Sequence, residues 1–442
     1  MLALSYARHV PAHVRVGRFV ADSPQLSWAF PFMKEHPETD VLVTGGTARD
    51  AVLGRTPRGI HLVVHGMPEV MLTEYKKYRN IPQDLDIRLP ASNIWHASDR
   101  RLEETRHHTL PINHDLARRD ATINAMAYSI RDGVMHDPFD GLRDIEERTL
   151  RTIGKPEDRF HEDPIRMARF LRLASELGFR VADDAWQAIT SHGHHLNRTS
   201  SDEAGHARYH IARAELGREV VDALTRAPKE ALKHFWDSGV IEHLAPELHK
   251  LKDLAHQHNI PGLDHATTIL EDLADHGASS SVIMAAMFAL FEDESKKVFE
   301  RTLERLHLPL LAEGSAMMAD IPFLLKYRNI LEEQSPDEMS PAQFEHIFEE
   351  KRGDDLLLFL HALAVTGGRK SLTRERWYLA KRRKESLSAT PDESLVRGRD
   401  LLSLGLSPGP HLRQLLEKIR NEQLSGRVHT KADALEFARS AI

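Results

Sequence analysis

Apolar runs that end in turn-forming residues mark the first third of the chain. The run DVLVTGG over residues 40–46 predicts a buried strand that enters a tight turn, because the apolar stretch closes on two glycines. The alternating stretch DLDIRLP over residues 84–90 predicts another strand. The full set of expected elements is strands over 40–46, 60–66 and 84–90, helices over 47–54 and 67–78, and a helix or strand over 121–130.

From about Asp144 the pattern changes to long amphipathic helices, and strand signals disappear. We therefore predict an α+β fold, with a small mixed sheet and its helices in front of an all-α remainder. The expected domains are a head over residues 1–150, a helical neck over 151–225, a helical body over 226–325 and a helical tail over 326–442.

Composition excludes several classes of protein. The 442 residues carry a net charge of −7, so a nucleic-acid surface must be local. Because the chain has no cysteine, disulfides, iron–sulfur clusters, thiolate zinc sites and a cysteine nucleophile are excluded. We find no leader pattern and no apolar run of about 18 residues, so we expect a cytoplasmic protein without membrane partners. The 28 histidines exceed the usual number.

Two short motifs in the head suit a phosphorylated ligand. Gly45 and Gly46 follow a strand, where backbone N–H groups can approach a phosphate, and Arg49 adds a guanidinium. Further on, Arg119 and Asp120 suit a triphosphate and a ribose hydroxyl. Taken singly, the first motif reads equally well as a plain strand-to-helix turn, and the second as a solvated helix start.

A third motif, EDPIRMARFLR, covers residues 162–172. Asp163, Arg166, Arg169 and Arg172 recur every third residue, which on a helix places the four on one broad face. Asp163 and Arg166 together offer acceptors and donors that can match the edge of a base. The alternative, a surface face of salt bridges, is favoured on this motif alone.

In this order the three motifs resemble the class II template-independent RNA nucleotidyltransferases, the bacterial-type CCA-adding enzymes and their poly(A) polymerase relatives. The chain has GGTARDAVLG, RRDATINAMAY, DPFDGLRDIEERTLRTIGKPEDRF and EDPIRMARFLRLASELGF. The segment over residues 398–419 also looks like the family's tail. The resemblance is strong from about residue 40 to 180 and looser through the middle.

The resemblance implies a polymerase-β-like head followed by helical neck, body and tail. It implies that Gly46 and Arg49 bind the triphosphate, and that Arg119 and Asp120 contact phosphate and ribose. It further implies that Asp163 and Arg166 read the base, with Arg169 and Arg172 as further nucleotide contacts. The implied partners are ATP, CTP and the 3′ end of a tRNA or another RNA, held by body and tail.

The chain departs from the family in the second strand. The family pattern R-D-I-D-L-V-V reads RGIHLVV here, so Gly59 and His61 occupy the positions of the two metal-binding aspartates. Mg²⁺, the metal expected for the family, prefers oxygen ligands, so its binding here is doubtful. Asp86 matches a third carboxylate position, and Asp84 lies two residues before it. The connection before Asp84 is also shorter than in the family, leaving only RNIPQ.

We weigh three functions in view of this departure. The first is RNA 3′-end nucleotide addition, of C and A or of A alone, with activity absent or reduced. The alternative is a catalytically inactive relative that binds RNA or nucleotide. A weaker third idea is that the histidine-bearing strand recruits a transition metal for different chemistry. The sequence does not separate CCA addition from A addition.

Three further features have two interpretations each. The basic segment over residues 369–384 suits RNA phosphates or a solvated helix face; its candidate contacts are Arg374, Arg376, Lys381, Arg382 and Arg383. An HD-phosphohydrolase-like stretch keeps His265 but has Glu292 in place of a ligand histidine, so we expect a scaffold. The scattered histidines, among them His192, His194 and His195, read as surface or packing residues rather than a metal site.

Overall fold

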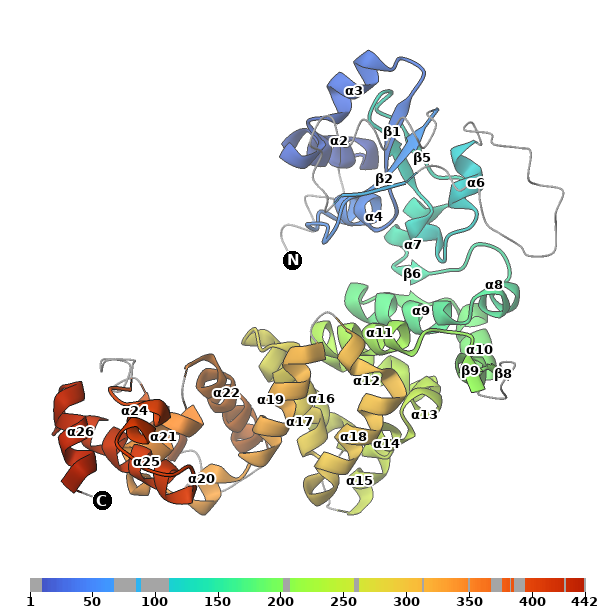
Figure 1. Cartoon of the computed structure of the whole chain (residues 1–442). Coiled ribbons are helices and arrows are strands. Elements are labelled where there is room, and N and C mark those ends of the chain that lie inside the picture. Colours follow the sequence, from blue (N-terminus) through green and yellow to red (C-terminus); the bar gives the residue numbers. More distant parts are fainter. Residues whose placement is uncertain are drawn as a thin grey trace. The chain divides into compact units, whose positions relative to one another are not determined.

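In the computed structural model, the N-terminal part of the chain forms a small mixed sheet, and mostly helices follow it along the sequence (Figure 1). The chain divides into two compact units, residues 1–211 with 238–240 and residues 212–237 with 241–442. The boundaries expected at residues 150, 225 and 325 remain predictions. The structure describes residues 10–66, 85–88, 111–201, 207–257, 262–311, 314–348, 350–366, 376–381, 383–384, 394–424 and 427–440.

In the described residues the sheet has five strands in the order β3-β2-β1-β4-β5. The pairs β1–β2, β1–β4 and β4–β5 are antiparallel, and β2–β3 is parallel. The α+β prediction with a mixed sheet is therefore confirmed. The strands are β1 (Asp40–Thr44), β2 (His61–His65), β3 (Asp86–Arg88), β4 (Ala127–Ser129) and β5 (Met135–His136). The predicted helix over 67–78 and Asp84 lie outside the described residues.

The central strands are covered on both faces. Val41, Leu42 and Val43 of β1 are all buried, although successive side chains of a strand point to opposite faces. On one face Leu42 packs with Leu116, Ala125, Ala127 and Ile153. This burial explains why β1 is a continuous apolar run rather than an alternating one.

The helix after β1 has glycine at both ends. Gly45 opens α4 (Gly45–Leu53) with φ of 65°, and Gly54 closes it with φ of 68°. Both values lie in the left-handed region, which glycine adopts without steric cost. The predicted helix over 47–54 is thus confirmed, with a start two residues earlier.

The first unit also contains helices and short strand pairs outside this sheet. The helices are α2 (Ala12–Asp22), α3 (Ala29–Glu35), α6 (Ile112–Leu116), η3 (Thr122–Asn124), α7 (Gly141–Glu146), α8 (Pro156–Glu162), α9 (Ile165–Leu177), α10 (Asp183–His192) and η4 (Gly193–Asn197). Between them lie the strand pairs β6 (Thr149–Leu150) with β7 (Arg180–Val181) and β8 (Thr199–Ser201) with β9 (Ala207–Tyr209). The prediction that strands end near Asp144 was therefore wrong, because two- and three-residue strands are too short to show an alternating pattern.

The second unit is helical in the part of the chain that the structure describes. Its longer helices are α11 (Arg213–Arg226), α12 (Pro228–Asp237), α16 (Gly262–Asp275), α17 (Ser280–Ala289), α18 (Ser295–Leu306), α19 (Gly314–Lys326), α21 (Pro341–Phe348), α22 (Glu350–Thr366), α25 (Pro410–Leu424) and α26 (Lys431–Ser440). Helix α17 is buried along its length. Among the described residues, no helix combines the length and the apolar character needed to cross a membrane.

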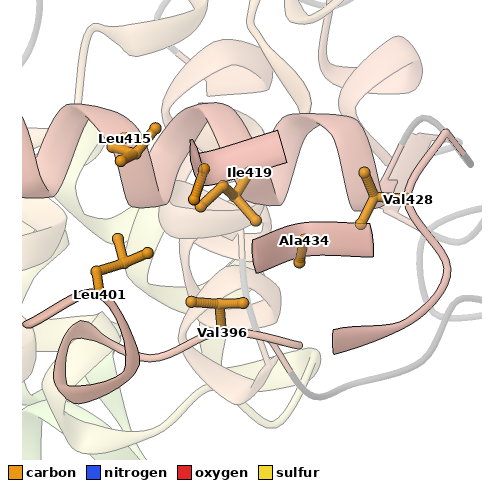
Figure 2. Packing of buried hydrophobic residues seen from close by; sticks show 7 residues of the cluster. Val396, Leu401, Leu415, Ile419, Val428 and Ala434 are labelled. Atoms are coloured by element: carbon orange, nitrogen blue, oxygen red, sulfur yellow. The ribbon is translucent and has the colours of Figure 1, made fainter. Parts of the chain in front are cut away.

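The end of the chain has its own small core. Leu415 and Ile419 of α25 pack with Val396, Leu401 and Ala434 (Figure 2). Val428 completes the cluster from the segment before α26. This core organises the segment over residues 398–419 that resembles the family's tail.

Candidate functional site

Arg49 and Arg119 meet at Asn124, just beyond the end of β1. Arg49 Nη1 donates to Asn124 Oδ1 at 2.8 Å, and Arg119 Nη1 donates to the Asn124 carbonyl oxygen at 3.4 Å. Each guanidinium also pairs with a carboxylate, Arg49 with Asp50 and Arg119 with Asp115, both at 2.8 Å. The sequence motifs that suggested a phosphate site, 70 residues apart, therefore form one cluster.

The glycine turn leaves room for this cluster. A Cβ atom on Gly45 would lie 2.6 Å from Arg119 Nη1, and one on Gly46 would lie 3.4 Å from Arg49 Nη2. The guanidinium groups of Arg49 and Arg119 therefore lie against the backbone of residues 45 and 46. Backbone N–H groups beside two guanidiniums are a suitable environment for phosphate oxygens.

Asp120 links the head to helix α9. Its Oδ1 accepts hydrogen bonds from the Asn124 side chain at 2.9 Å and from the Ala121 amide at 2.8 Å. Its Oδ2 lies 3.5 Å from Arg169 Nη1. Burial by itself would raise the pKa of Asp120, but Arg169, Asn124, Ala121 and Arg119 together lower it. Asp120 is thus held as a carboxylate.

Helix α9 carries three of the four residues of the third motif. Arg166, Arg169 and Arg172 lie on α9, whereas Asp163 is the extended residue that directly follows α8. The prediction of one helical face with all four was therefore wrong, because Pro164 separates the two helices. Asp163 still lies close to the motif, with its Oδ2 3.8 Å from Arg166 Nε.

Arg166 and Arg159 support the backbone that carries the Arg119 motif. Arg166 Nη2 donates to the Arg118 carbonyl oxygen at 3.4 Å, and Arg159 Nη2 donates to the Arg119 carbonyl oxygen at 2.7 Å. Glu162 pairs with both guanidiniums. Arg159 lies in the quoted segment KPEDRF, but no spacing in the sequence indicated this contact.

Arg172 points to a different partner. Its Nη1 lies 3.2 Å from Glu176, which also pairs with Arg58 at 3.2 Å. Arg58 directly precedes Gly59, so this carboxylate connects α9 to the segment that leads into β2. The pairing of Arg58 with Glu176 was missed in the sequence because these two residues lie 118 positions apart.

Gly59, His61 and Asp86 lie together where β2 and β3 run in parallel. His61 and Asp86 are register partners, and His61 Nδ1 lies 2.9 Å from Asp86 Oδ2. The buried Thr47 fixes this segment, because its Oγ1 donates to the Gly59 carbonyl oxygen at 2.9 Å and accepts from the His61 amide at 2.8 Å. The position that a Cβ of Gly59 would take is 3.8 Å from His61 Nε2.

These residues do not fit a pair of magnesium ions. Gly59 offers no side-chain ligand, and the carboxylate of Asp86 is bonded to an imidazole. Across the described ranges, no three histidine, aspartate or glutamate side chains are grouped so that they could hold a metal ion. A two-ion site needs carboxylate oxygens that bridge ions about 3.5–4 Å apart.

The basic segment in the second unit is partly used within the chain. Arg376 donates to the carbonyl oxygens of Leu331 and Glu332, both at 3.0 Å. Arg383 bonds to carbonyl oxygens of the loop before α21 and stacks over Phe344, 4.6 Å from the ring centre. Lys381 lies over Trp377 at 5.4 Å. Arg374 and Arg382 lie outside the described residues.

The HD-like stretch is also placed in the second unit. His265 lies on α16, and Glu292 lies in the short 3-10 helix η5 (Glu292–Glu294) after α17. Glu292 has a left-handed φ of 48°. These two residues belong to no metal-holding group among the described side chains, and the scaffold interpretation remains a prediction.

Comparison with known proteins supports the motif resemblance. Residues 41–151 match the model of the poly(A) polymerase head domain. The CCA-adding enzyme of Levilactobacillus brevis is 25% identical over 418 residues, covering 89% of this chain and 92% of that protein.

Two solved structures have the same fold. A Bacillus stearothermophilus CCA-adding enzyme in complex with CTP aligns with a TM-score of 0.63 at 23% identity, covering 95% of this chain and 99% of the other. A Thermotoga maritima CCA-adding enzyme complexed with tRNA_CCA aligns with a TM-score of 0.53 at 19% identity, covering 96% and 98%. The head-domain match, the near full-length relative and the shared fold agree with the motifs, and together they support the resemblance of this chain to the class II CCA-adding enzymes and poly(A) polymerases.

Proposed function

We propose that this chain binds nucleoside triphosphates and the 3′ end of tRNA, and that it adds nucleotides at an absent or strongly reduced rate. One observation carries the second half of this proposal. Gly59 and His61 stand where the family has its two metal-binding aspartates, and His61 engages Asp86.

The chemistry of the reaction explains why this substitution matters. In the family reaction, the 3′-hydroxyl of the RNA attacks the α-phosphate, and two metal ions stabilise the attacking and leaving oxygens. A neutral imidazole suits Zn²⁺, Ni²⁺ or Cu²⁺ better than Mg²⁺. Among the residues that the structure describes here, a glycine, a histidine and one aspartate do not supply the pair of carboxylates that this mechanism requires.

The nucleotide side of the site is supported by the cluster around Asn124. We assign the triphosphate to Gly45, Gly46, Arg49 and Arg119, whose donors gather at the end of β1. The existing bonds of both arginines to carboxylates and to Asn124 hold the guanidiniums in place before a ligand binds, which lowers the entropic cost of binding.

We assign recognition of the sugar and the base to Asp120 and to residues in and just before α9. We assign the ribose hydroxyl to the Asp120 carboxylate, which Arg169 supports. Asp163 and Arg166 are assigned to the base edge, and the side chain of Asp163 is 43% exposed. Arg172 is assigned a further nucleotide contact, although Glu176 holds it in this structure.

The proposed partners are tRNA or another RNA 3′ end, with ATP and CTP as nucleotides. Relatives solved with CTP and with tRNA_CCA share this fold. Of the described candidates in the basic segment, Lys381 is the one best suited to a phosphate, because Arg376 and Arg383 already bind carbonyl oxygens. Mg²⁺ is the metal that the resemblance implies, and Gly59, His61 and Asp86 do not fit a pair of these ions.

An extension assay tests the proposal. The protein is incubated with tRNA that lacks its 3′ CCA, labelled CTP and ATP, and either Mg²⁺ or Mn²⁺, while tRNA binding is measured in parallel. We expect micromolar tRNA binding with no multi-turnover extension. Clear multi-turnover extension would establish an active transferase and overturn the reduced-activity proposal, and an arm with ATP alone would then separate A addition from CCA addition. Absence of tRNA binding would overturn the recognition half.

A further inference from the structure

Four histidine side chains gather at the junction of α8, α10 and η4. The ring centre of His195 lies 4.3 Å from that of His194, 5.2 Å from that of His192 and 6.2 Å from that of His161. Arg198 joins them, with its Nη2 3.1 Å from His195 Nε2. His161 and His194 are exposed, so the group is accessible. We call these five residues the histidine cluster.

The cluster is neutral at its centre in this arrangement. An arginine can only donate, so Nε2 of His195 must accept the hydrogen bond from Arg198 and carries no proton. Burial and the charges of Arg198, His194, His192 and His161 all lower the pKa of His195. A proton on His195 would remove this acceptor and release the Arg198 guanidinium.

Helix α8 also carries Glu157 and Asp158 in its first turn, three to four residues before His161. None of the groups that shift the pKa of His195 is acidic. Glu162, next to His161 on α8, pairs with Arg159 and Arg166. Asp183 and Asp184 lie in the first turn of α10, at the end opposite His192. The charged groups that act on His195 are therefore basic ones, which disfavour its protonation. A negatively charged ligand would offset this repulsion and allow His195 to take up a proton.

The arrangement favours an anion over a metal. Within the part of the chain that the structure describes, these side chains form no group of three that could hold a metal ion. Imidazolium and guanidinium groups are instead the donors that bind phosphate oxygens. We propose that the histidine cluster is a phosphate-binding site that takes up protons when a phosphate group of RNA binds. The choice of RNA rests on the proposed function above; the phosphate chemistry does not.

RNA binding at two pH values tests the proposal in the full-length chain. The test variant is His192→Gln/His194→Gln/His195→Gln, and the matched control is His13→Gln/His276→Gln/His429→Gln, three exposed histidines elsewhere. The affinity for labelled tRNA is measured by fluorescence anisotropy at pH 8 and pH 6 at constant ionic strength. We expect wild type and control to bind about tenfold more tightly at pH 6, equivalent to one unit of coupled pKa shift. The test variant should lose most of this gain.

Inorganic phosphate provides the second arm, read from the histidine ring signals in NMR spectra. We expect phosphate to shift cluster signals in wild type and not in the test variant. The single variant His194→Gln, at an exposed ring, replaces the triple variant if the latter melts early.

Each outcome tests a different statement of the proposal. An unchanged pH dependence in the test variant overturns RNA as the ligand, and absence of ring shifts with phosphate overturns the phosphate site. Ring shifts with stoichiometric ZnCl₂ but not with phosphate would make the cluster a metal site instead. Failure of wild type to bind tRNA at either pH would contradict the proposed function, while the phosphate arm would still decide the cluster.

Discussion

His61 Nδ1 lies 2.9 Å from Asp86 Oδ2, and both residues sit at the same register of the parallel pair β2–β3. The side chains are 47% and 34% exposed, so both reach solvent on the same edge of the sheet. Asp86, which the resemblance places at a third carboxylate position, thus contacts the imidazole at a position where the family has an aspartate. If the proposed site is correct, the histidine removes one carboxylate and also occupies a second one.

Restoring both aspartates should restore chemistry if the rest of the site is intact. The Cβ of an aspartate at position 59 meets nothing closer than His61 Nε2 at 3.8 Å, and an aspartate at position 61 removes the imidazole that contacts Asp86. We expect Gly59→Asp/His61→Asp to extend tRNA with Mg²⁺ at least about 100-fold faster than wild type, a barrier difference of about 2.7 kcal/mol. Initial rates with labelled CTP measure this.

Single variants serve as controls for the restored pair. Each alone supplies one aspartate where the mechanism needs a pair, so each should fall well short of the double variant. A double variant that binds CTP and tRNA yet extends no faster than wild type would show that the site has further defects, with the shortened connection before Asp84 as the next place to look.

Thr47 should be the main support of the segment around His61. Its buried hydroxyl donates to the Gly59 carbonyl oxygen and accepts from the His61 amide. Thr47→Val keeps the shape but leaves both backbone groups without this partner, so we expect a loss of about 1–3 kcal/mol in the free energy of unfolding. Thr47→Ser retains the hydroxyl and should lose less than half of that. If both variants lose the same free energy of unfolding in urea, the methyl group of Thr47 contributes as much as its hydrogen bonds, which would contradict this prediction.

Elements that depend on neighbouring residues could be predicted from the sequence, whereas contacts between distant segments could not. Strand β1 and helix α4 were predicted because an apolar run and terminal glycines mark them directly. The meeting of Arg49 with Asn124 was not, since it depends on the pairing of β1 with β4, a contact between distant segments. The histidine cluster was only partly predictable: His192, His194 and His195 are neighbours in the sequence, but His161 lies about 30 residues earlier and joins them through the packing of α8 against α10.

The carboxylate of Asp120 should make a pH-dependent contribution to stability. Its pKa is lowered in the folded protein despite burial, so its contribution is complete above the unfolded pKa of about 3.9 and is lost as the pH falls through the folded value. We expect Asp120→Asn to cost about 1–3 kcal/mol at pH 7, below the value for a fully buried pair because Arg169 is 34% exposed. The difference from wild type should shrink below about pH 4.

Thermal melts of wild type and Asp120→Asn at pH 7, 5 and 3.5 check this. The two proteins should differ equally at pH 7 and 5, where the carboxylate is ionised in both folded and unfolded chains. A difference that grows as the pH falls would contradict a lowered pKa for Asp120.

Gly45 and Gly54 separate backbone strain from ligand binding. Both have left-handed φ values, 65° and 68°, so alanine should cost about 1–2 kcal/mol of stability at either position. Only at Gly45 would the new Cβ meet a functional group, Arg119 Nη1 at 2.6 Å, whereas nothing lies within 4 Å of a Cβ on Gly54. The end of a long side chain yields easily, so Gly45→Ala should displace the Arg119 guanidinium with little additional loss of stability. We expect similar melting temperatures for the two variants but CTP binding at least about fivefold weaker for Gly45→Ala, a difference of about 1 kcal/mol by calorimetry. Equal CTP affinity in both variants would remove Arg119 from the proposed triphosphate site.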